Sequence, residues 1–588
     1  MSPRAASIPV IFLLLLTVPG FASAQELARE SLLRRPIALV LRGSVLYSGN
    51  RRSGSVSAID LSTRTVRQEV EVAKQLSDLV PMPDGTFIAT DEAAGSLIGL
   101  RRGPRSIEVA WTLPVGRSPV NVCAGGDGSW CSVSLLWPRR LVIVALSPTT
   151  RRVRNVIDLP VAPRRQCVLP DGKTLVVADS FGGNLALVDA ASGRIRAVRS
   201  LQGHNIRGLT VAGNRLLISH PILEQAVSTT DSNVFWGSVI GNVLQSVSLR
   251  GLPPTEEDGP PGPSGAVPIG HWSLYALGDP GHAAGDPGDV QVTRDGVAVV
   301  ALGGVNELAI GRLDDGMFRR IAVGQHPVAI ALAPNGRMAY VANEFDDSIS
   351  VVDLAGPKVV STIRLGPEPP LSEADRGEIL FHDARLSRDG WYSCNSCHTD
   401  GHTCGLKNDN FSDGSFGTPK RILSLMGAGR TGPWAWNGSN ATLEDQIHKS
   451  ILSTMQGKTS IASRENVEAL AAYVRTLPPP PSLARARDQA DDGAAVRGRR
   501  VFEKLDCVHC HKPPTYTSDQ VYDVGLADEA GLRRFNPPSL LGVSQLPRLL
   551  HDGRAANLRE VFTRFDHPDG ERLPRGELDD LLAFLNSL

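Results

Sequence analysis

The sequence predicts a multidomain chain in which an all-β, seven-bladed propeller precedes two mostly α-helical domains. Three observations predict it: turn dipeptides recur about every 42 residues in the first part, a Cys-x-x-Cys-His motif occurs twice in the last part, and the sequence around that motif is duplicated. With 588 residues, the chain can form several hydrophobic cores. Lys plus Arg and Asp plus Glu both number 61, so we expect no nucleic-acid partner.

The first 24 residues have the features of a secretory signal peptide. Arg4 precedes an apolar run from Val10 to Leu16, and Ala22 to Ala24 are the small residues expected before a cleavage site. The apolar run is too short to cross a hydrocarbon layer about 30 Å thick. We therefore expect cleavage after Ala24 and a periplasmic protein without a transmembrane anchor.

The propeller is predicted over residues 25–366 from seven hairpin turns. Asp-Gly and Asn-Gly favour tight hairpins because both central residues need positive φ, and four short strands per unit of about 42 residues are typical of a propeller blade. One interval is about twice the others, which predicts an insertion at about 222–287 that includes a Pro- and Gly-rich stretch. No convergent catalytic residues are evident in this region, so we interpret the propeller as a scaffold or as a docking surface for a protein substrate. The turns begin at Gly43, Asp84, Asp127, Asp171, Gly213, Asp295 and Asn335.

Two Cys-x-x-Cys-His motifs in the last 220 residues match the pattern for covalent attachment of haem c. Two thiols three residues apart on one helical turn can bond both vinyl groups of a porphyrin, and the adjacent imidazole can ligate the iron. A zinc site built from both Cys pairs is the alternative, and the His that follows each pair argues against it. The predicted haem-binding residues are Cys394, Cys397 and His398 in the first motif and Cys507, Cys510 and His511 in the second.

The sequence on both sides of the motifs is also duplicated. Arg376-Gly377 precedes the first motif as Arg497-Gly498 precedes the second, and each half ends in a segment with helical apolar spacing, over 467–477 and 578–588. Four consecutive prolines, 478–481, separate the halves because a helix cannot continue through them. We therefore predict two cytochrome c-like domains, over 367–478 and 479–588.

These 220 residues resemble the bacterial dihaem cytochrome c peroxidases, a family that includes dihaem enzymes that oxidise tryptophans of a partner protein. The resemblance rests on both haem motifs, the Trp436-Asn-Gly sequence, the segment that ends at Gln446, and the His551-Asp-Gly-Arg sequence. It implies that the first haem reacts with peroxide, that the second relays electrons, and that Trp436 lies between them. It also implies Ca²⁺ between the cytochrome domains and a small cytochrome or cupredoxin as electron donor or acceptor.

One departure from the family concerns proton transfer. Gln446 matches the family's glutamine, but ten residues later, where the peroxidases carry a glutamate, this chain has Gln456. A carboxylate can accept and return a proton of peroxide, and an amide cannot. The candidate catalytic residues are thus Trp436, Gln446 and Gln456, with His448 as a substitute proton carrier, and we expect Gln456→Glu to raise peroxide turnover.

A second departure concerns the sixth iron ligands. No methionine follows Met455, so the second domain cannot provide the thioether that many family members use. His567 is the candidate in its place, with Tyr516 and Tyr522 as alternatives, and an imidazole would lower the reduction potential. For the first haem, the candidates are His402, Met426 and Met455.

Four cysteines lie outside the haem motifs. Cys123 and Cys131 flank a predicted turn, which favours a cross-strand disulfide in an oxidising compartment. The sequence leaves the state of Cys167 and Cys404 open.

Together these features predict an exported dihaem oxidoreductase that reacts with peroxide or an organic or protein substrate at the first haem and relays electrons through the second. The alternative is a non-enzymatic dihaem electron-transfer protein whose propeller docks a partner. A hydrolase active in the propeller is a third interpretation, and it would keep its activity without haem.

Overall fold

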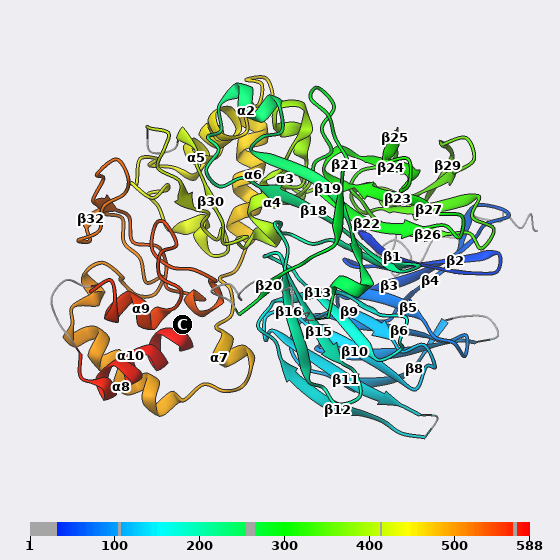
Figure 1. Ribbon diagram of the computed structural model, residues 1–588, viewed down its shortest axis with the longest axis horizontal. Coiled ribbons are helices and arrows are strands. Elements are labelled where there is room, and N and C mark those ends of the chain that lie inside the picture. The colour runs from blue at the N-terminus through cyan, green and yellow to red at the C-terminus, as the bar shows by residue number, and fades with distance from the viewer. Residues whose placement is uncertain (1–31, 104–106, 148, 254–264, 412–413, 568–572) are drawn as a thin grey trace, which may run out of the picture.

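The computed structural model describes residues 32–103, 107–147, 149–253, 265–411, 414–567 and 573–588. A β-propeller packs beside two helical domains (Figure 1). The predicted signal peptide, 1–24, lies outside the described residues. Within these ranges, no helix combines the length and apolar character needed to cross a membrane.

Seven four-stranded antiparallel blades form the propeller, which confirms the predicted fold class. In each blade the strands pair in chain order, and every predicted turn joins the first strand to the second. Gly336, for example, has φ +68° in the turn before β27, a conformation that glycine adopts without steric cost. The strands are, blade by blade, β1 (Pro36–Arg42), β2 (Val45–Asn50), β3 (Ser55–Asp60), β4 (Thr65–Glu71); β5 (Leu76–Pro81), β6 (Phe87–Asp91), β7 (Ser96–Arg102), β8 (Ile107–Pro114); β9 (Pro119–Ala124), β10 (Trp130–Leu135), β11 (Arg140–Leu146), β12 (Arg151–Asp158); β13 (Pro163–Val168), β14 (Thr174–Asp179), β15 (Asn184–Asp189), β16 (Ile195–Ser200); β17 (Gly208–Ala212), β18 (Arg215–Leu223), β19 (Ile240–Ser248), β21 (Trp272–Ala276); β22 (Pro287–Val292), β23 (Val297–Leu302), β24 (Glu307–Arg312), β25 (Met317–Ala322); β26 (Pro327–Leu332), β27 (Met338–Asn343), β28 (Ser348–Asp353) and β29 (Lys358–Arg364).

The same side-chain contact joins blades six and seven and closes the ring. The Asn306 side chain accepts a hydrogen bond from His326 N (2.9 Å) at the start of blade seven. The Asp347 carboxylate, in the equivalent place after β27, accepts from the N atoms of Arg34 (2.8 Å) and Arg35 (2.7 Å) just before β1. The ring therefore closes through side-chain contacts, since β1 to β4 form the first blade and β26 to β29 form the seventh.

The predicted insertion belongs to the fifth blade. The helix α2 (Asp231–Phe235) lies between β18 and β19, and β20 (Val267–Pro268) pairs in parallel with β16 of the preceding blade. Most of the predicted Pro- and Gly-rich stretch, 254–264, lies outside the described residues.

The expected disulfide between Cys123 and Cys131 is not formed, and both thiols are free. Cys131 pairs with Ala124 across the hairpin, whereas Cys123 pairs with Ser132. Because directly paired residues share a face and neighbours along a strand alternate faces, the two cysteines point to opposite faces of the sheet. The position of the turn was predicted correctly, but the turn alone does not define which residues pair across it.

Two helical domains follow the propeller, as predicted from the duplication. The first contains α3 (Glu373–Phe381), α4 (Cys394–Cys397), α5 (Leu443–Lys449), the π-helical turn η9 (Ser450–Thr454), α6 (Arg464–Thr476), and the short pair β30 (Lys407–Asn408) and β31 (Lys420–Arg421). The second contains α7 (Leu483–Ala486), α8 (Asp492–Lys504), the 3₁₀ turn η10 (Cys507–His509), α9 (Leu558–Thr563), α10 (Arg575–Ser587), and the pair β32 (Tyr522–Asp523) and β33 (Arg534–Phe535).

One glycine in each domain lets two helices cross closely. α3 packs on α6 through Gly377, and α8 packs on α10 through Gly498. A Cβ atom at either position would overlap a backbone carbonyl oxygen of the facing helix, that of Ala469 or Asp580. The duplicated Arg-Gly sequence therefore marks the helix crossing that supports each haem motif.

The propeller holds the first cytochrome domain at its haem-attachment turn. The Asp286 carboxylate accepts hydrogen bonds from the hydroxyls of Ser393 and Ser396, which cap α4. His204 Nε2 donates to the Ser396 carbonyl (3.0 Å), and Asp400 forms ion pairs with Arg164 and Arg207. Three propeller blades thus contact the segment that carries the first motif.

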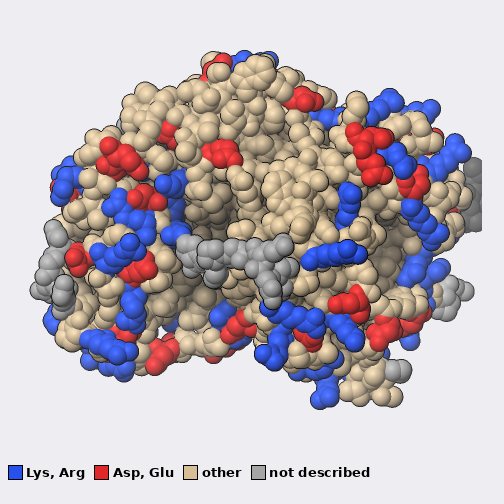
Figure 2. All heavy atoms as spheres, in the orientation of Figure 1, with Lys and Arg blue, Asp and Glu red and all other residues tan. Residues whose placement is uncertain are grey.

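The second cytochrome domain is fixed to the third blade. Arg139 Nη2 donates to the Gln545 carbonyl (2.6 Å), and Arg487 Nε donates to the Pro138 carbonyl (2.7 Å). Basic and acidic side chains are mixed over the visible face of both parts (Figure 2), so this face has no field of a single sign. The propeller therefore fixes both haem domains relative to each other.

The crossing of α8 and α10 generates a stability prediction. We expect Gly498→Ala to lower the free energy of unfolding by about 1–3 kcal/mol, because the added methyl group overpacks a backbone contact. The matched control is Gly576→Ala, also on a helix of this pair, where an added Cβ meets no atom within 4 Å and stability should change by less than about 1 kcal/mol. Thermal denaturation of both variants measures the difference, and equal effects would contradict the close crossing.

Candidate functional site

The first Cys-x-x-Cys-His motif forms a single helical turn with its histidine at the end. Ser393 and Ser396 form a capping box that starts α4, and His398 follows directly. His398 Nδ1 donates to the Leu423 carbonyl (2.8 Å), which leaves Nε2 free to ligate a metal. Burial lowers the pKa of His398 to about 4, so the imidazole is neutral, as an iron ligand must be.

The second motif repeats this arrangement. His511 Nδ1 donates to the Tyr516 carbonyl (3.0 Å), and burial lowers its pKa to about 4. In each domain, two thiols and one unshared Nε2 therefore come from one short turn, which is the donor set that haem c requires. Both sets fit a covalently bound haem, with Cys394, Cys397, Cys507 and Cys510 as attachment residues.

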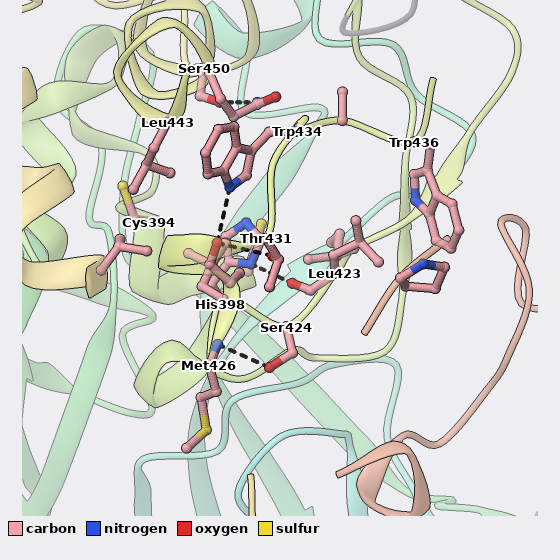
Figure 3. A pocket seen from close by; sticks show the side chains of 18 of the residues that line it. Cys394, His398, Leu423, Ser424, Met426, Thr431, Trp434, Trp436, Leu443 and Ser450 are labelled. Atoms are coloured by element: carbon pink, nitrogen blue, oxygen red, sulfur yellow. Dashed lines mark hydrogen bonds between the residues drawn. The ribbon is translucent and has the colours of Figure 1, made fainter. Parts of the chain in front are cut away.

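A cavity of about 310 Å³ extends from Cys394 and His398 toward Trp436 (Figure 3). Its walls are mainly apolar and come from α5, α6 and the segments around β31, with Thr517 and Asn536 of the second domain at one end. Among the described lining residues there is no Asp or Glu. The cavity can thus enclose a flat apolar group, and it offers no carboxylate for proton transfer.

Trp436 lies where the two cytochrome domains meet. Its Nε1 donates to the Arg421 carbonyl (2.8 Å), and its own carbonyl accepts from Asn536 N (2.8 Å) in the second domain. The ring is edge-on to His551, with centroids 6.4 Å apart, and His551 is stacked on Phe535. Trp436 therefore contacts residues of both cytochrome domains.

Gln446 lines the cavity in a fixed orientation. Its Nε2 donates to Ser450 Oγ (3.0 Å), and its Oε1 accepts from Asn440 Nδ2 (2.8 Å). The amide is therefore held by neighbours on both sides, and it can orient a polar ligand without exchanging a proton with it.

Gln456 does not line the cavity, contrary to its expected role at the glutamate position. Its Nε2 donates to the carbonyls of Thr229 (2.7 Å) in the propeller insertion and Ser453 (2.8 Å). The backbone at Gln456 has φ +53°, which turns the chain away after η9. His448, the substitute proton carrier, is exposed on α5. The spacing from Gln446 did not account for this turn.

The three candidate sixth ligands of the first haem differ in their position relative to the cavity. His402 Nδ1 binds Ser424 (3.0 Å), and its ring packs edge-on against Trp137 and Phe181 of the propeller, outside the cavity lining. Met426 borders the cavity, with its side chain directed away from His398 (Figure 3). Met455 is buried and also borders it, so it is the remaining thioether candidate.

In the second domain, His567 and the two tyrosines differ in their contacts. His567 Nδ1 is buried without a hydrogen-bond partner in the described part of the chain, and its proximity contributes to the lowered pKa of His511. The Tyr516 ring packs against Phe502 in the core, and the Tyr522 hydroxyl bonds the His509 carbonyl (3.3 Å).

The sequence did not predict the role of several residues that shape the site. Asp286 and His204 hold α4 from the propeller, and Arg421 lines the cavity beside Trp436. No local pattern could have indicated the first two, because their partners lie more than 100 residues away.

Comparison with known proteins agrees with the resemblance predicted for the helical part. Residues 372–478, which span the first cytochrome domain, match the family described as "Di-haem cytochrome c peroxidase". The methylamine utilization protein MauG of Methylophilus methylotrophus is 27% identical, over 37% of this chain and 82% of that protein. The cytochrome c551 peroxidase of Nitrosomonas europaea is 24% identical, over 37% and 79%.

A further relative carries a different name. The hydrazine synthase subunit gamma of Kuenenia stuttgartiensis is 28% identical, over 40% of this chain and 88% of that protein. A solved structure of Kuenenia stuttgartiensis hydrazine synthase aligns with 57% of this chain and 99% of that chain, at 19% identity and a TM-score of 0.48.

The position of Gln456 changes the expected effect of its substitution. Gln456→Glu places a carboxylate against two carbonyl oxygens outside the cavity, so peroxide turnover should not rise by the 10²- to 10⁴-fold that a general acid–base residue can provide. The variant should instead be less stable by about 1–3 kcal/mol, because it loses two donated hydrogen bonds. Steady-state peroxide assays and thermal denaturation test both parts, and a large rise in turnover would contradict this placement.

His567 generates a second prediction at this site. If its imidazole ligates the second iron, His567→Met should raise the midpoint potential of one haem by more than about 59 mV, a tenfold change for one electron, because thioether ligation raises the potential. Redox titration measures the shift, and Tyr522→Phe is the control that should leave both potentials in place.

Proposed function

We propose that this chain is an exported dihaem c-type oxidoreductase that reacts with peroxide or an organic or protein substrate at the first haem and relays electrons through the second. The observation that carries the proposal is the position of Trp436, which is bonded to both cytochrome domains at the end of the first cavity. The relatives, named as peroxidases or MauG, support oxidoreductase activity.

Different residues of the chain attach the haem and orient its ligand. Cys394 and Cys397 hold the first haem and His398 ligates its iron, while Gln446 orients a polar ligand in the cavity. When bound, the haem provides the redox chemistry itself. The protein excludes water from the apolar cavity and holds Trp436 between the domains.

The carboxylate-free lining also shapes the choice of substrate. Peroxide cleavage benefits from a group that moves a proton between the two oxygens, and the described lining has none. We therefore favour an organic or protein substrate, with a small cytochrome or cupredoxin as redox partner. The second candidate function, a dihaem electron carrier, is favoured by the same lining and by Met455 as a sixth ligand.

The propeller is proposed to have two roles. It holds the two haem domains relative to each other, and it provides a docking surface. Its contacts with α4 and with Gln545 fix the distance between the haem domains. Among the described residues, no group of three or more His, Cys, Asp or Glu could hold a metal ion, so the Ca²⁺ implied by the resemblance has no assigned ligands.

Spin state distinguishes the enzyme from the carrier. We expect electron paramagnetic resonance of the ferric or half-reduced protein to show a high-spin fraction, because an open iron position is needed for reaction. The high-spin signal should change when peroxide is added. Trp436→Phe should preserve this signal and slow electron transfer between the haems by at least tenfold in rapid-mixing experiments. Trp434→Phe, another cavity tryptophan, is the matched control. Two fully low-spin haems with no response to peroxide would contradict the enzyme.

A further inference from the structure

In the part of the chain that the structure describes, Arg421 is a buried cation without a carboxylate partner. The residue is 2% exposed, Nε donates to the Leu550 carbonyl (3.1 Å), and Nη1 is buried with no hydrogen-bond partner among the residues that the structure describes. The adjacent Lys420 forms an ion pair with Asp528 (3.0 Å). The nearby carboxylate is thus already occupied, and Arg421 forms no ion pair within the described ranges.

A buried charge in this state is costly. Burial alone lowers the pKa of Arg421, to about 10, and no neighbouring acid opposes the effect. Proteins rarely bury an unpaired charge, because its lost hydration is not repaid. The guanidinium therefore has a free donor, Nη1, for an anion that is not one of the described side chains around it.

The position of Arg421 indicates the source of that anion. Its guanidinium lies over the Trp436 ring, 5.3 Å from the centroid, and both residues line the first cavity. Cys394 lies on the opposite side of this cavity from Trp436 (Figure 3). A haem c is bonded to cysteines through its vinyl edge, and its two propionate carboxylates extend from the other edge. A porphyrin held by Cys394 and Cys397 would therefore direct its carboxylates toward the side of the cavity where Arg421 lies.

We propose that Arg421 binds a propionate of the first haem through its free Nη1 and holds this carboxylate against Trp436. The planar guanidinium, with donors in a fixed fork, suits a carboxylate better than an ammonium group does. This proposal rests on haem attachment at Cys394 and Cys397, which is part of the proposed function. It adds a binding site for the haem carboxylates at the junction of the two domains.

The test is Arg421→Gln in the full-length holoprotein. Loss of the cation removes a charge that stabilises the reduced haem, so we expect the midpoint potential of one haem to fall by at least 59 mV, which is a tenfold change in its reduction equilibrium. The propionate-bending band in the resonance Raman spectrum should shift for the same haem. Arg421→Lys, which keeps the charge, should recover most of the potential, and Arg430→Gln, at an exposed position of the same domain, should change neither signal.

The outcomes separate this proposal from the function on which it rests. Pyridine haemochrome analysis must give two haems per chain in Arg421→Gln; none in the parent protein would overturn the proposed function as a whole. The haem whose midpoint potential falls in Arg421→Gln must differ from the haem whose potential rises in His567→Met, because His567→Met identifies the second haem. Two attached haems with unchanged potentials and an unchanged propionate band would overturn the role of Arg421, and a shift confined to the second haem would also overturn it as stated.

Discussion

The hydrogen bond from each haem-motif imidazole to a backbone carbonyl is the constraint on which the site depends. With Nδ1 donated to Leu423 in one domain and to Tyr516 in the other, each ring has one tautomer and one orientation. Nε2 then remains free to ligate the iron of a porphyrin that the two thiols would hold. The cavity, the helix crossing at Gly377 or Gly498, and Trp436 matter because they are arranged around these two fixed atoms.

The propeller extends this constraint over a longer range. Asp286 binds the hydroxyls that cap α4, so the turn carrying the first motif is held from the propeller side as well as from its own domain. Arg139 holds the second domain through Gln545. In the proposed function, electron transfer would depend on the separation of the haems, and a propeller that contacts both domains would preserve that separation.

The sequence predicted what local chemistry determines and missed what distant contacts determine. Turns that need positive φ, such as the one at Gly336, recur at blade spacing, and the spacing of Cys394, Cys397 and His398 is itself a chemical requirement. The blade count and the haem motifs could therefore be predicted. The direction of Gln456 depends on a carbonyl 227 residues earlier in the chain, and the faces of Cys123 and Cys131 depend on a register that turn spacing alone does not define.

The electrostatics around Trp436 connect the cavity to electron transfer. A guanidinium over the indole opposes any positive charge on that ring, since the two charges would repel across a poorly solvated space. An unpaired Arg421 would thus make Trp436 a poor carrier of an electron hole. A carboxylate bound to Arg421 would cancel this effect. The carboxylate that pairs with the buried cation would therefore also make the tryptophan between the domains easier to oxidise. Binding of the haem carboxylate by Arg421 would thus favour electron transfer through Trp436.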